Sequence, residues 1–183
     1  MATPAQRTNT WILNQWYDQA VAGTQGDPPP EIELWGWGYN EYGNLGQNNT
    51  NSGYSSPVQI PGNMWDAPRF QTAAPGRTSG QLNAGVQCGH MTKRDGTLWY
   101  IGGFDFNYGT SGLDNTTEYS SPTQVGTDTT WTRPVGTLVT LARKTDGTLW
   151  SWGRNDYGQQ GNNDTTNRSS PKQVGTNATW NYV

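Results

Sequence analysis

One pattern of residues occurs three times along the 183-residue chain and limits the folds that the chain can adopt. Each copy starts with Leu-Trp, passes through a glycine-rich and then an Asn/Thr-rich stretch, and ends with Ser-Ser-Pro-x-Gln before Val or Ile. The copies and the tryptophan that follows each of them are 34–60 with Trp65, 98–125 with Trp131, and 149–174 with Trp180. Because repeated units bury their apolar faces against one another, the chain is expected to be a stack of similar units.

Each repeat predicts a small antiparallel sheet of three or four short strands. Asp95-Gly96 and Asp146-Gly147 each separate two strand-like runs, which indicates two-residue hairpins because both residue types tolerate positive φ. The Ser-Ser-Pro stretch is expected to end a loop, and the Gln-Val that follows is expected to begin another strand. One such sheet is not stable alone, so neighbouring sheets must pack face to face.

The Leu-Trp starts of the repeats are the expected core. Alternation along Trp-x-Trp directs both rings to the same face of a sheet, and in stacked sheets that face is normally packed. Stacking of the rings on a bound sugar is the alternative interpretation. The predicted core residues are Leu34, Trp35, Trp37, Leu98, Trp99, Leu149, Trp150 and Trp152.

The composition also favours short strands. Only 31% of the residues are hydrophobic, but 10 Trp and 9 Tyr can build a core from few side chains, and 24 Gly and 11 Pro supply turns. This balance predicts an all-β protein. The net charge of −3 argues against a nucleic-acid partner, and no apolar run is long enough for a membrane helix or a secretion signal. Cys88 is the one cysteine, so no disulfide is expected within the chain.

The third repeat carries a family resemblance. Residues 146–161, DGTLWSWGRNDYGQQG, with Ser-Ser-Pro-Lys-Gln-Val at 169–174, resemble the regulator-of-chromosome-condensation (RCC1) repeat. The family pattern is D-G-x-L-W-x-W-G-x-N-x-x-G-x-L-G, followed by a polar loop and S-x-P-x-x-V. The first repeat matches it closely. The third has Gln160 where the family usually has Leu, and the second has Ile101 in place of the second Trp.

The resemblance implies an incomplete β-propeller. It assigns about three blades to residues 31–183, with repeats near 31–65, 85–131 and 135–183, and it fits poorly at 66–86. The family's usual ring has seven blades, and most propellers hold four to eight. About three blades therefore leave sheet faces and edges that other copies or a host assembly must cover.

Residues 1–30 are interpreted as an N-terminal anchor segment and a Pro-rich linker. Apolar residues recur there at i, i+4 and i+8, which predicts a short helix. The side chains expected to anchor the chain to a partner are Trp11, Ile12, Trp16 and Tyr17, with packing on the first blade as the alternative. With the incomplete propeller, this segment resembles short RCC1-repeat proteins in the virions of tailed, especially marine, bacteriophages.

The polar residues do not form a recognisable catalytic or cofactor site. His90 is the single histidine, and the Cys88-x-His90 pair lacks the further ligands of a zinc site, so both are predicted to lie in an inner strand. Asp95 and Asp146 recur at equivalent positions, which indicates a structural role in a hairpin more than acid–base catalysis. We therefore predict a protein that is not an enzyme and has no cofactor or metal.

Three functions follow as hypotheses from these features. The leading one is a structural component of a phage virion, assembled in the host cytoplasm, that decorates, cements or extends the particle and contacts other virion proteins or copies of itself. The second is a receptor- or glycan-binding adhesin that uses the Asn/Thr-rich loops 48–54, 115–118 and 162–168. The third, a guanine-nucleotide exchange factor or chromatin binder, is disfavoured by the acidic net charge.

Overall fold

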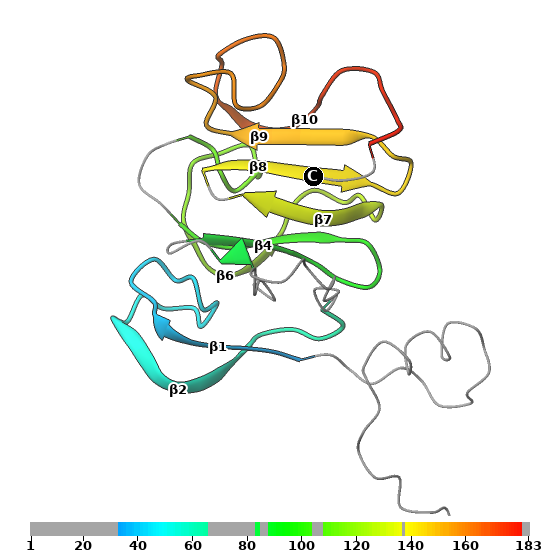
Figure 1. Ribbon diagram of the computed structural model, residues 1–183. Helices are drawn as coiled ribbons and strands as arrows, with labels where there is room; N and C mark the ends of the chain where they lie inside the picture. The colour runs from blue at the N-terminus through cyan, green and yellow to red at the C-terminus, as the bar shows by residue number, and fades with distance from the viewer. Residues whose placement is uncertain (1–32, 66–82, 85–87, 104–107, 137, 181–183) are drawn as a thin grey trace, which may run out of the picture. The chain divides into compact units, whose positions relative to one another are not determined.

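The computed structural model describes residues 33–65, 83–84, 88–103, 108–136 and 138–180 (Figure 1). The regular elements in these ranges are all β-strands, which confirms the all-β prediction. The helix expected near the N-terminus lies outside the described residues. The strands are β1 (Leu34–Tyr39), β2 (Gly53–Ile60), β3 (Asn83–Ala84), β4 (Cys88–Thr92), β5 (Leu98–Gly102), β6 (Tyr119–Gln124), β7 (Trp131–Gly136), β8 (Val139–Lys144), β9 (Leu149–Gly153) and β10 (Arg168–Gln173).

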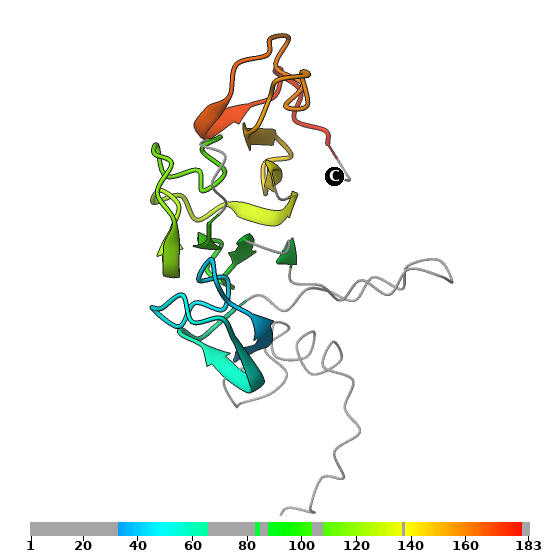
Figure 2. The ribbon, with the colours of Figure 1, turned by 90° about the vertical axis from the view of Figure 1, so that its left-hand side faces the viewer.

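The described strands form three antiparallel sheets, one for each repeat. The first sheet pairs β1 with β2, the second has the order β3-β4-β5-β6, and the third has the order β7-β8-β9-β10. Figures 1 and 2 show the three sheets one above another, with the first in blue and cyan and the third in yellow to red. The second and third repeats thus have four strands, within the expected three or four, and the first has two among the described residues.

The Asp-Gly hairpins are one residue longer than predicted. The Lys93 backbone N–H donates to the Thr97 carbonyl (3.0 Å), and the Gly96 N–H donates back to the Lys93 carbonyl (2.9 Å). The loop therefore holds three residues, and Gly96 alone takes the positive φ (79°) that such a turn needs. The expectation of a two-residue turn with positive φ at both residues was wrong, because Asp95 serves instead as a hydrogen-bond acceptor for the loop.

The Ser-Ser-Pro segments lie inside strands, contrary to the prediction that they end loops. They form the middle of β2, β6 and β10, and the last two are the outermost strands of their sheets. In the third sheet the register shifts between Arg168, opposite Gly153, and Lys172, opposite Ser151. Pro171 lies in this irregular stretch, where its missing N–H costs no ladder hydrogen bond.

A glycine exchange tests how tightly the third hairpin is packed. Gly147 has φ +85°, and a Cβ there would lie 2.0 Å from the Ala178 carbonyl oxygen, whereas Gly175 has φ +61° and open space around it. Both alanine variants lose about 1–2 kcal/mol to the left-handed backbone conformation. We expect Gly147→Ala to cost clearly more than Gly175→Ala in urea unfolding, because backbone atoms must move. Equal costs would contradict this close packing of the hairpin.

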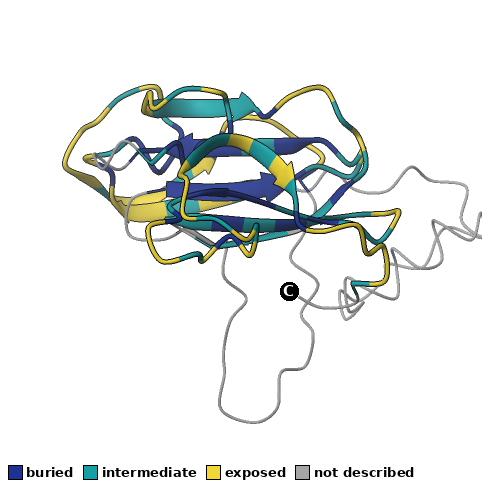
Figure 3. Cartoon of the chain, turned by 90° about the horizontal axis from the view of Figure 1, so that it is seen from above, coloured by how far each residue is buried: buried dark blue, intermediate teal, exposed yellow. Residues whose placement is uncertain are grey.

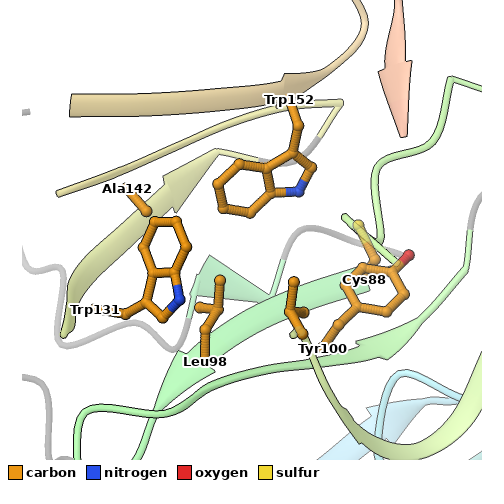
Figure 4. Packing of buried hydrophobic residues seen from close by; sticks show 7 residues of the cluster. Cys88, Leu98, Tyr100, Trp131, Ala142 and Trp152 are labelled. Carbon is orange, nitrogen blue, oxygen red and sulfur yellow. The ribbon is translucent and has the colours of Figure 1, made fainter. Parts of the chain in front are cut away.

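The core lies between successive sheets. Leu98 and Tyr100 of β5 face Trp131, Ala142 and Trp152 of the third sheet (Figure 4). A second cluster joins the first and second sheets and contains Ile60, Trp65, Met91 and Ile101, with Leu34 and Trp99 packed against it. Figure 3 shows that buried residues follow the strands while exposed residues gather mainly in the loops. At each junction, the face of one sheet that carries the leucine of its Leu-Trp pair therefore packs on the face of the next sheet that carries the tryptophan of that pair.

Candidate interaction surface

The two Asp-Gly hairpins carry the same chain of hydrogen bonds. Asp95 Oδ1 accepts hydrogen bonds from the Thr97 N–H (3.0 Å) and the Thr97 hydroxyl (2.7 Å), and the Trp99 indole donates to Thr97 Oγ1 (2.8 Å). The third repeat repeats this chain through Asp146, Thr148 and Trp150 at 2.9, 2.7 and 2.9 Å. The hydrogen bonds from Thr97 lower the pKa of Asp95. Each carboxylate therefore fixes a hairpin and orients a tryptophan.

A lysine lies over two tryptophans in each of these repeats. Lys144 Nζ is 3.9 Å from the Trp150 ring centroid and 4.6 Å from that of Trp131. The second repeat places Lys93 Nζ in the same way, 4.2 Å from Trp99 and 4.9 Å from Trp65. The two rings of each pair meet edge to face with centroids 5.8 Å apart. The tryptophan after one repeat is thus joined to the hairpin of the next.

Lys144 also forms an ion pair that sets up a pH-dependent prediction. Its Nζ lies 2.5 Å from Asp128 Oδ2, and this contact, with a hydrogen bond from Thr130, lowers the pKa of Asp128 to about 2. Stability from this low pKa is present above the unfolded-state value near 4 and is lost as the pH falls toward 2. We expect Lys144→Met to lower the free energy of unfolding by about 1–2 kcal/mol at pH 7 and to flatten its dependence between pH 4 and 2.

The control for this change is Lys172→Met. Lys172 Nζ is 3.9 Å from Asp164 and its side chain is half exposed, so this pair is worth little. Urea unfolding at pH 7, 4 and 2.5 compares the two variants. A Lys144→Met protein as stable as the Lys172→Met protein would show that the lysine–tryptophan contacts do not stabilise the fold.

The corresponding tryptophans of the first repeat are exposed, contrary to the prediction that they belong to the core. Trp35 and Trp37 occupy the positions of Trp150 and Trp152, yet they are 49% and 65% exposed. The reason is that the preceding sheet packs on the corresponding face of the second and third sheets, whereas the described part of the chain places no sheet before the first one. We call the exposed side chains of Trp35, Trp37 and Tyr39 the aromatic face.

The other predicted core residues lie inside the sheets. Leu98, Leu149 and Trp152 are buried. Leu34, Trp99 and Trp150 are half-buried and pack against the two core clusters. The predicted core therefore differs from the observed one only at Trp35 and Trp37, where the described residues place no sheet on the face of the first sheet.

The polar groups of Trp35 and Tyr39 already have partners. The Trp35 indole donates to Glu33 Oε2 (3.2 Å), at the position where the other repeats have a threonine. The Tyr39 hydroxyl donates to Glu41 Oε2 (2.6 Å), which raises the pKa of Tyr39 to about 12. The apolar surfaces of the rings and the Trp37 indole N–H remain for contact, so the face is suited to bury against another protein surface.

Comparison with known families gives a direct match to two of the repeats. The model of the regulator of chromosome condensation (RCC1) repeat matches residues 33–79 and 146–180. The chain carries RCC1 repeats. No curated protein matches this sequence significantly. Within the RCC1 repeats, the aromatic face belongs to the first matched segment and the Asp146 hairpin to the second.

Solved structures of RCC1 proteins have the same fold. They include Prp20p from Saccharomyces cerevisiae, reported with its binding to Gsp1p and histones, at 18% identity and TM-score 0.58, covering 80% of this chain and 35% of Prp20p. Human WBSCR16 is 20% identical with a TM-score of 0.56, and the match covers 82% of this chain and 41% of WBSCR16. Yeast RCC1 (Prp20) bound to Kap60 is 18% identical with a TM-score of 0.58, and the match covers 80% of this chain and 34% of that protein. The chain thus spans about a third to two fifths of these proteins, as an incomplete propeller would.

Two buried asparagines of the RCC1 repeats were not singled out from the sequence. Asn40 and Asn155 are fully buried, and their Oδ1 atoms accept hydrogen bonds from the N–H groups of Leu45 (3.0 Å) and Gln160 (2.9 Å). They hold the loop that follows the Leu-Trp strand. Their recurrence within Gly-x-Asn-x-x-Gly is the signal that could have found them, although the glycines alone suffice to predict a tight turn there.

Cys88 and His90 lie where the sequence placed them, in an inner strand. Both are buried in β4, and His90 Nδ1 lies 3.4 Å from the Thr140 hydroxyl. The His90 ring contacts Tyr100 and Trp152 at 4.9 and 5.3 Å between centroids. Burial lowers the pKa of His90 to about 4, so the ring is neutral at pH 7. This histidine packs between the second and third blades.

The remaining predictions concern anchors, metals and membranes. Trp11, Ile12, Trp16 and Tyr17, the predicted anchor residues, lie outside the described residues. In the ranges that the structure describes, no three His, Cys, Asp or Glu side chains come together as metal ligands. No helix in those ranges has the length and apolar character needed to cross a bilayer.

Proposed function

We propose that this chain is a non-enzymatic structural component of a large assembly, a phage virion, in which it acts by contact with neighbouring proteins. The observation that carries the proposal is the aromatic face. Trp35 and Trp37 are exposed. At the same repeat positions of the other two blades, a lysine lies over Trp99 and Trp150, and Ile101 and Trp152 are buried. Exposed aromatic side chains gathered on one strand are typical of protein interaction sites.

The recurring carboxylates support a structural role over catalysis. Asp95 and Asp146 each use one oxygen to accept two hydrogen bonds from the threonine two residues later. These carboxylates stabilise the hairpins, and the same hydrogen bonds stabilise the hairpin in each of two blades. Among the described residues, the aromatic face, and not these carboxylates, is therefore where we expect a partner to bind.

The loops of the adhesin hypothesis are occupied by internal hydrogen bonds. Asn49 Nδ2 donates to the Tyr54 hydroxyl (2.9 Å), and Asn115 Nδ2 donates to that of Tyr119 (2.9 Å). Asn162 Nδ2 donates to Ser151 Oγ (3.0 Å). These amides close their own loops, which favours the structural role over glycan binding. The exchange-factor and chromatin-binder hypothesis rests on the family resemblance, and the net charge of −3 speaks against a nucleic-acid partner.

Incorporation into particles tests the proposed function. A tagged full-length chain is produced in the phage-infected host, particles are purified on a density gradient, and the tag is quantified by immunoblot. We expect the wild-type chain in the particles and a strong loss for Trp35→Ser/Trp37→Ser. Thr117→Ala, an exposed loop change, is the control and should incorporate normally. Absence of the wild-type chain from purified particles would refute the virion role.

A further inference from the structure

The contact between successive blades is the same at both junctions inside the chain. The Asn48 N–H of the first repeat donates to the Ser120 carbonyl of β6 (2.7 Å), and the Asp114 N–H of the second donates to the Ser169 carbonyl of β10 (2.8 Å). Asn48 and Asp114 have nearly equal positive φ, 56° and 60°. Ser120 and Ser169 are both the first serine of Ser-Ser-Pro. A loop of one blade thus docks on the outer strand of the next.

Glycines allow the two backbones to meet at these junctions. A Cβ on Gly43 would lie 2.5 Å from Ser120 Cα, and one on Gly109 would lie 2.4 Å from Ser169 Cα. Real Cβ atoms do not approach a backbone atom so closely, so the junction requires glycine at this repeat position. The glycine followed by a left-handed Asn or Asp is therefore a docking surface for Ser-Ser-Pro.

The third repeat presents the same docking loop with no strand on it. Gly158 and Asn163 occupy the positions of Gly109 and Asp114, with φ of 77° and 59°. A Cβ on Gly158 would meet only the Asp164 carbonyl oxygen, at 3.9 Å. Among the described residues, nothing lies where Ser169 lies at the preceding junction.

The first repeat presents the complementary strand with no loop on it. Ser55 and Ser56 of β2 precede Pro57 in the same motif, and all three residues are exposed. The described residues place no loop against Ser55. The chain therefore carries both halves of one more junction, at opposite ends of its row of blades.

The tryptophans fit the same arrangement. The Trp180 N–H donates to the Gly147 carbonyl (3.2 Å), as the Trp131 N–H donates to the Gly96 carbonyl (3.0 Å). Trp131 then packs on the first tryptophan of the next Leu-Trp-x-Trp strand. The residue at that position in the first repeat is Trp35, half of whose surface is exposed.

The second tryptophan of the motif has a matching acceptor. The Trp152 indole donates to the Thr110 carbonyl in the loop of the preceding blade (3.0 Å). Trp37 is the equivalent of Trp152, and Gln159 is the equivalent of Thr110. Thr110 is itself part of a polar loop, so the polar Gln159 loop is a suitable seat for an indole.

We propose that the chain associates head to tail with a second copy of itself, the loop from 158 to 163 of one copy docking on β2 and the aromatic face of the next. The occupant of the aromatic face is thus a blade that this chain already contains. Such a contact is heterologous, so it forms a ring or an extending row and not a closed symmetric dimer. The inference deepens the proposed structural role, on which it rests, by naming the partner.

Sedimentation velocity of the purified full-length chain tests the association. We expect the wild-type chain to form concentration-dependent oligomers. Gly158→Asn, which keeps a residue type that tolerates positive φ but fills the docking loop, should weaken association by about tenfold or more. Gly175→Asn is the control, because Gly175 has positive φ and its counterpart Gly126 is open even beside a neighbouring blade. A monomeric wild type, or equal association of both variants, would overturn the proposal.

Cysteine cross-linking tests the direction of the contact and does not need a folding-sensitive glycine change. Asn163→Cys and Ser55→Cys are prepared separately, mixed and oxidised, with circular dichroism to compare their folding. The mixture should give a cross-linked dimer, and each variant alone should give only the background of buried Cys88. A dimer from either variant alone would indicate a symmetric interface and overturn the head-to-tail arrangement. A chain that stays monomeric in these experiments but enters particles would refute this inference and leave the proposed function standing.

Discussion

Replacing Trp152 by alanine is expected to lower the free energy of unfolding by about 3–5 kcal/mol, a large loss for a single substitution. The side chain is fully buried, its indole donates across the blade junction to Thr110, and its ring contacts Trp131 and His90. Truncation leaves a cavity between two blades and an unpaired carbonyl. Urea unfolding followed by far-ultraviolet circular dichroism measures the loss.

The repeat itself supplies the matched control. Trp37→Ala removes the same residue type from the same repeat position, but the side chain is 65% exposed. At a protein concentration low enough to keep the chain monomeric, its cost should stay within about 0.5 kcal/mol. His90→Ala should cost less than Trp152→Ala, because it removes fewer contacts. If Trp37→Ala or His90→Ala matched Trp152→Ala, the core would have been placed wrongly.

Acid should destabilise the protein through His90. Its folded-state pKa is about 4, against 6.5 when unfolded, so the unfolded chain binds more protons between these values. Stability is therefore complete above pH 6.5 and falls as the pH drops toward 4, by up to about 3 kcal/mol. The groups facing the ring are Tyr100, Thr140 and Trp152, and none of them titrates in this window.

The slope of stability against pH identifies the histidine. Because His90 is the only histidine in the chain, His90→Gln should remove most of the dependence between pH 6.5 and 5, whatever its effect on absolute stability. Urea midpoints at pH 7, 6 and 5 measure this slope. An unchanged slope in His90→Gln would mean that another group carries the acid sensitivity.

The repeat pattern predicted the fold class because it reports local geometry. Leu-Trp alternation, Asp-Gly turns and Ser-Ser-Pro recur in each unit, and each is a property of a few neighbouring residues. The turn length was missed because Asp-Gly is compatible with two- and three-residue loops. The choice is made by the Lys93–Thr97 pairing and by Asp95 accepting from Thr97, which are visible only in the folded hairpin.

The candidate surface was harder to predict than the fold. Trp35 and Trp37 carry the same local pattern as Trp150 and Trp152, and the burial of these tryptophans depends on whether another sheet packs on them. Burial of this kind is a non-local property. The repeat pattern therefore predicted the positions of the two tryptophans in the strand correctly and their burial wrongly. Lys144 was missed for a different reason. Lys93 of the second repeat also stands two residues before an Asp-Gly pair. A lysine in a sequence, however, ordinarily indicates a solvated surface.

The close backbone contact at each blade junction bears on how such a chain can grow. The spacing between neighbouring units is set by main-chain atoms meeting across a glycine, as at Gly43 and Gly109. Copying one unit within the gene therefore lengthens the protein by a ready-made module, and unequal crossing-over removes one. Longer chains that are only 18% and 20% identical to this one have the same fold.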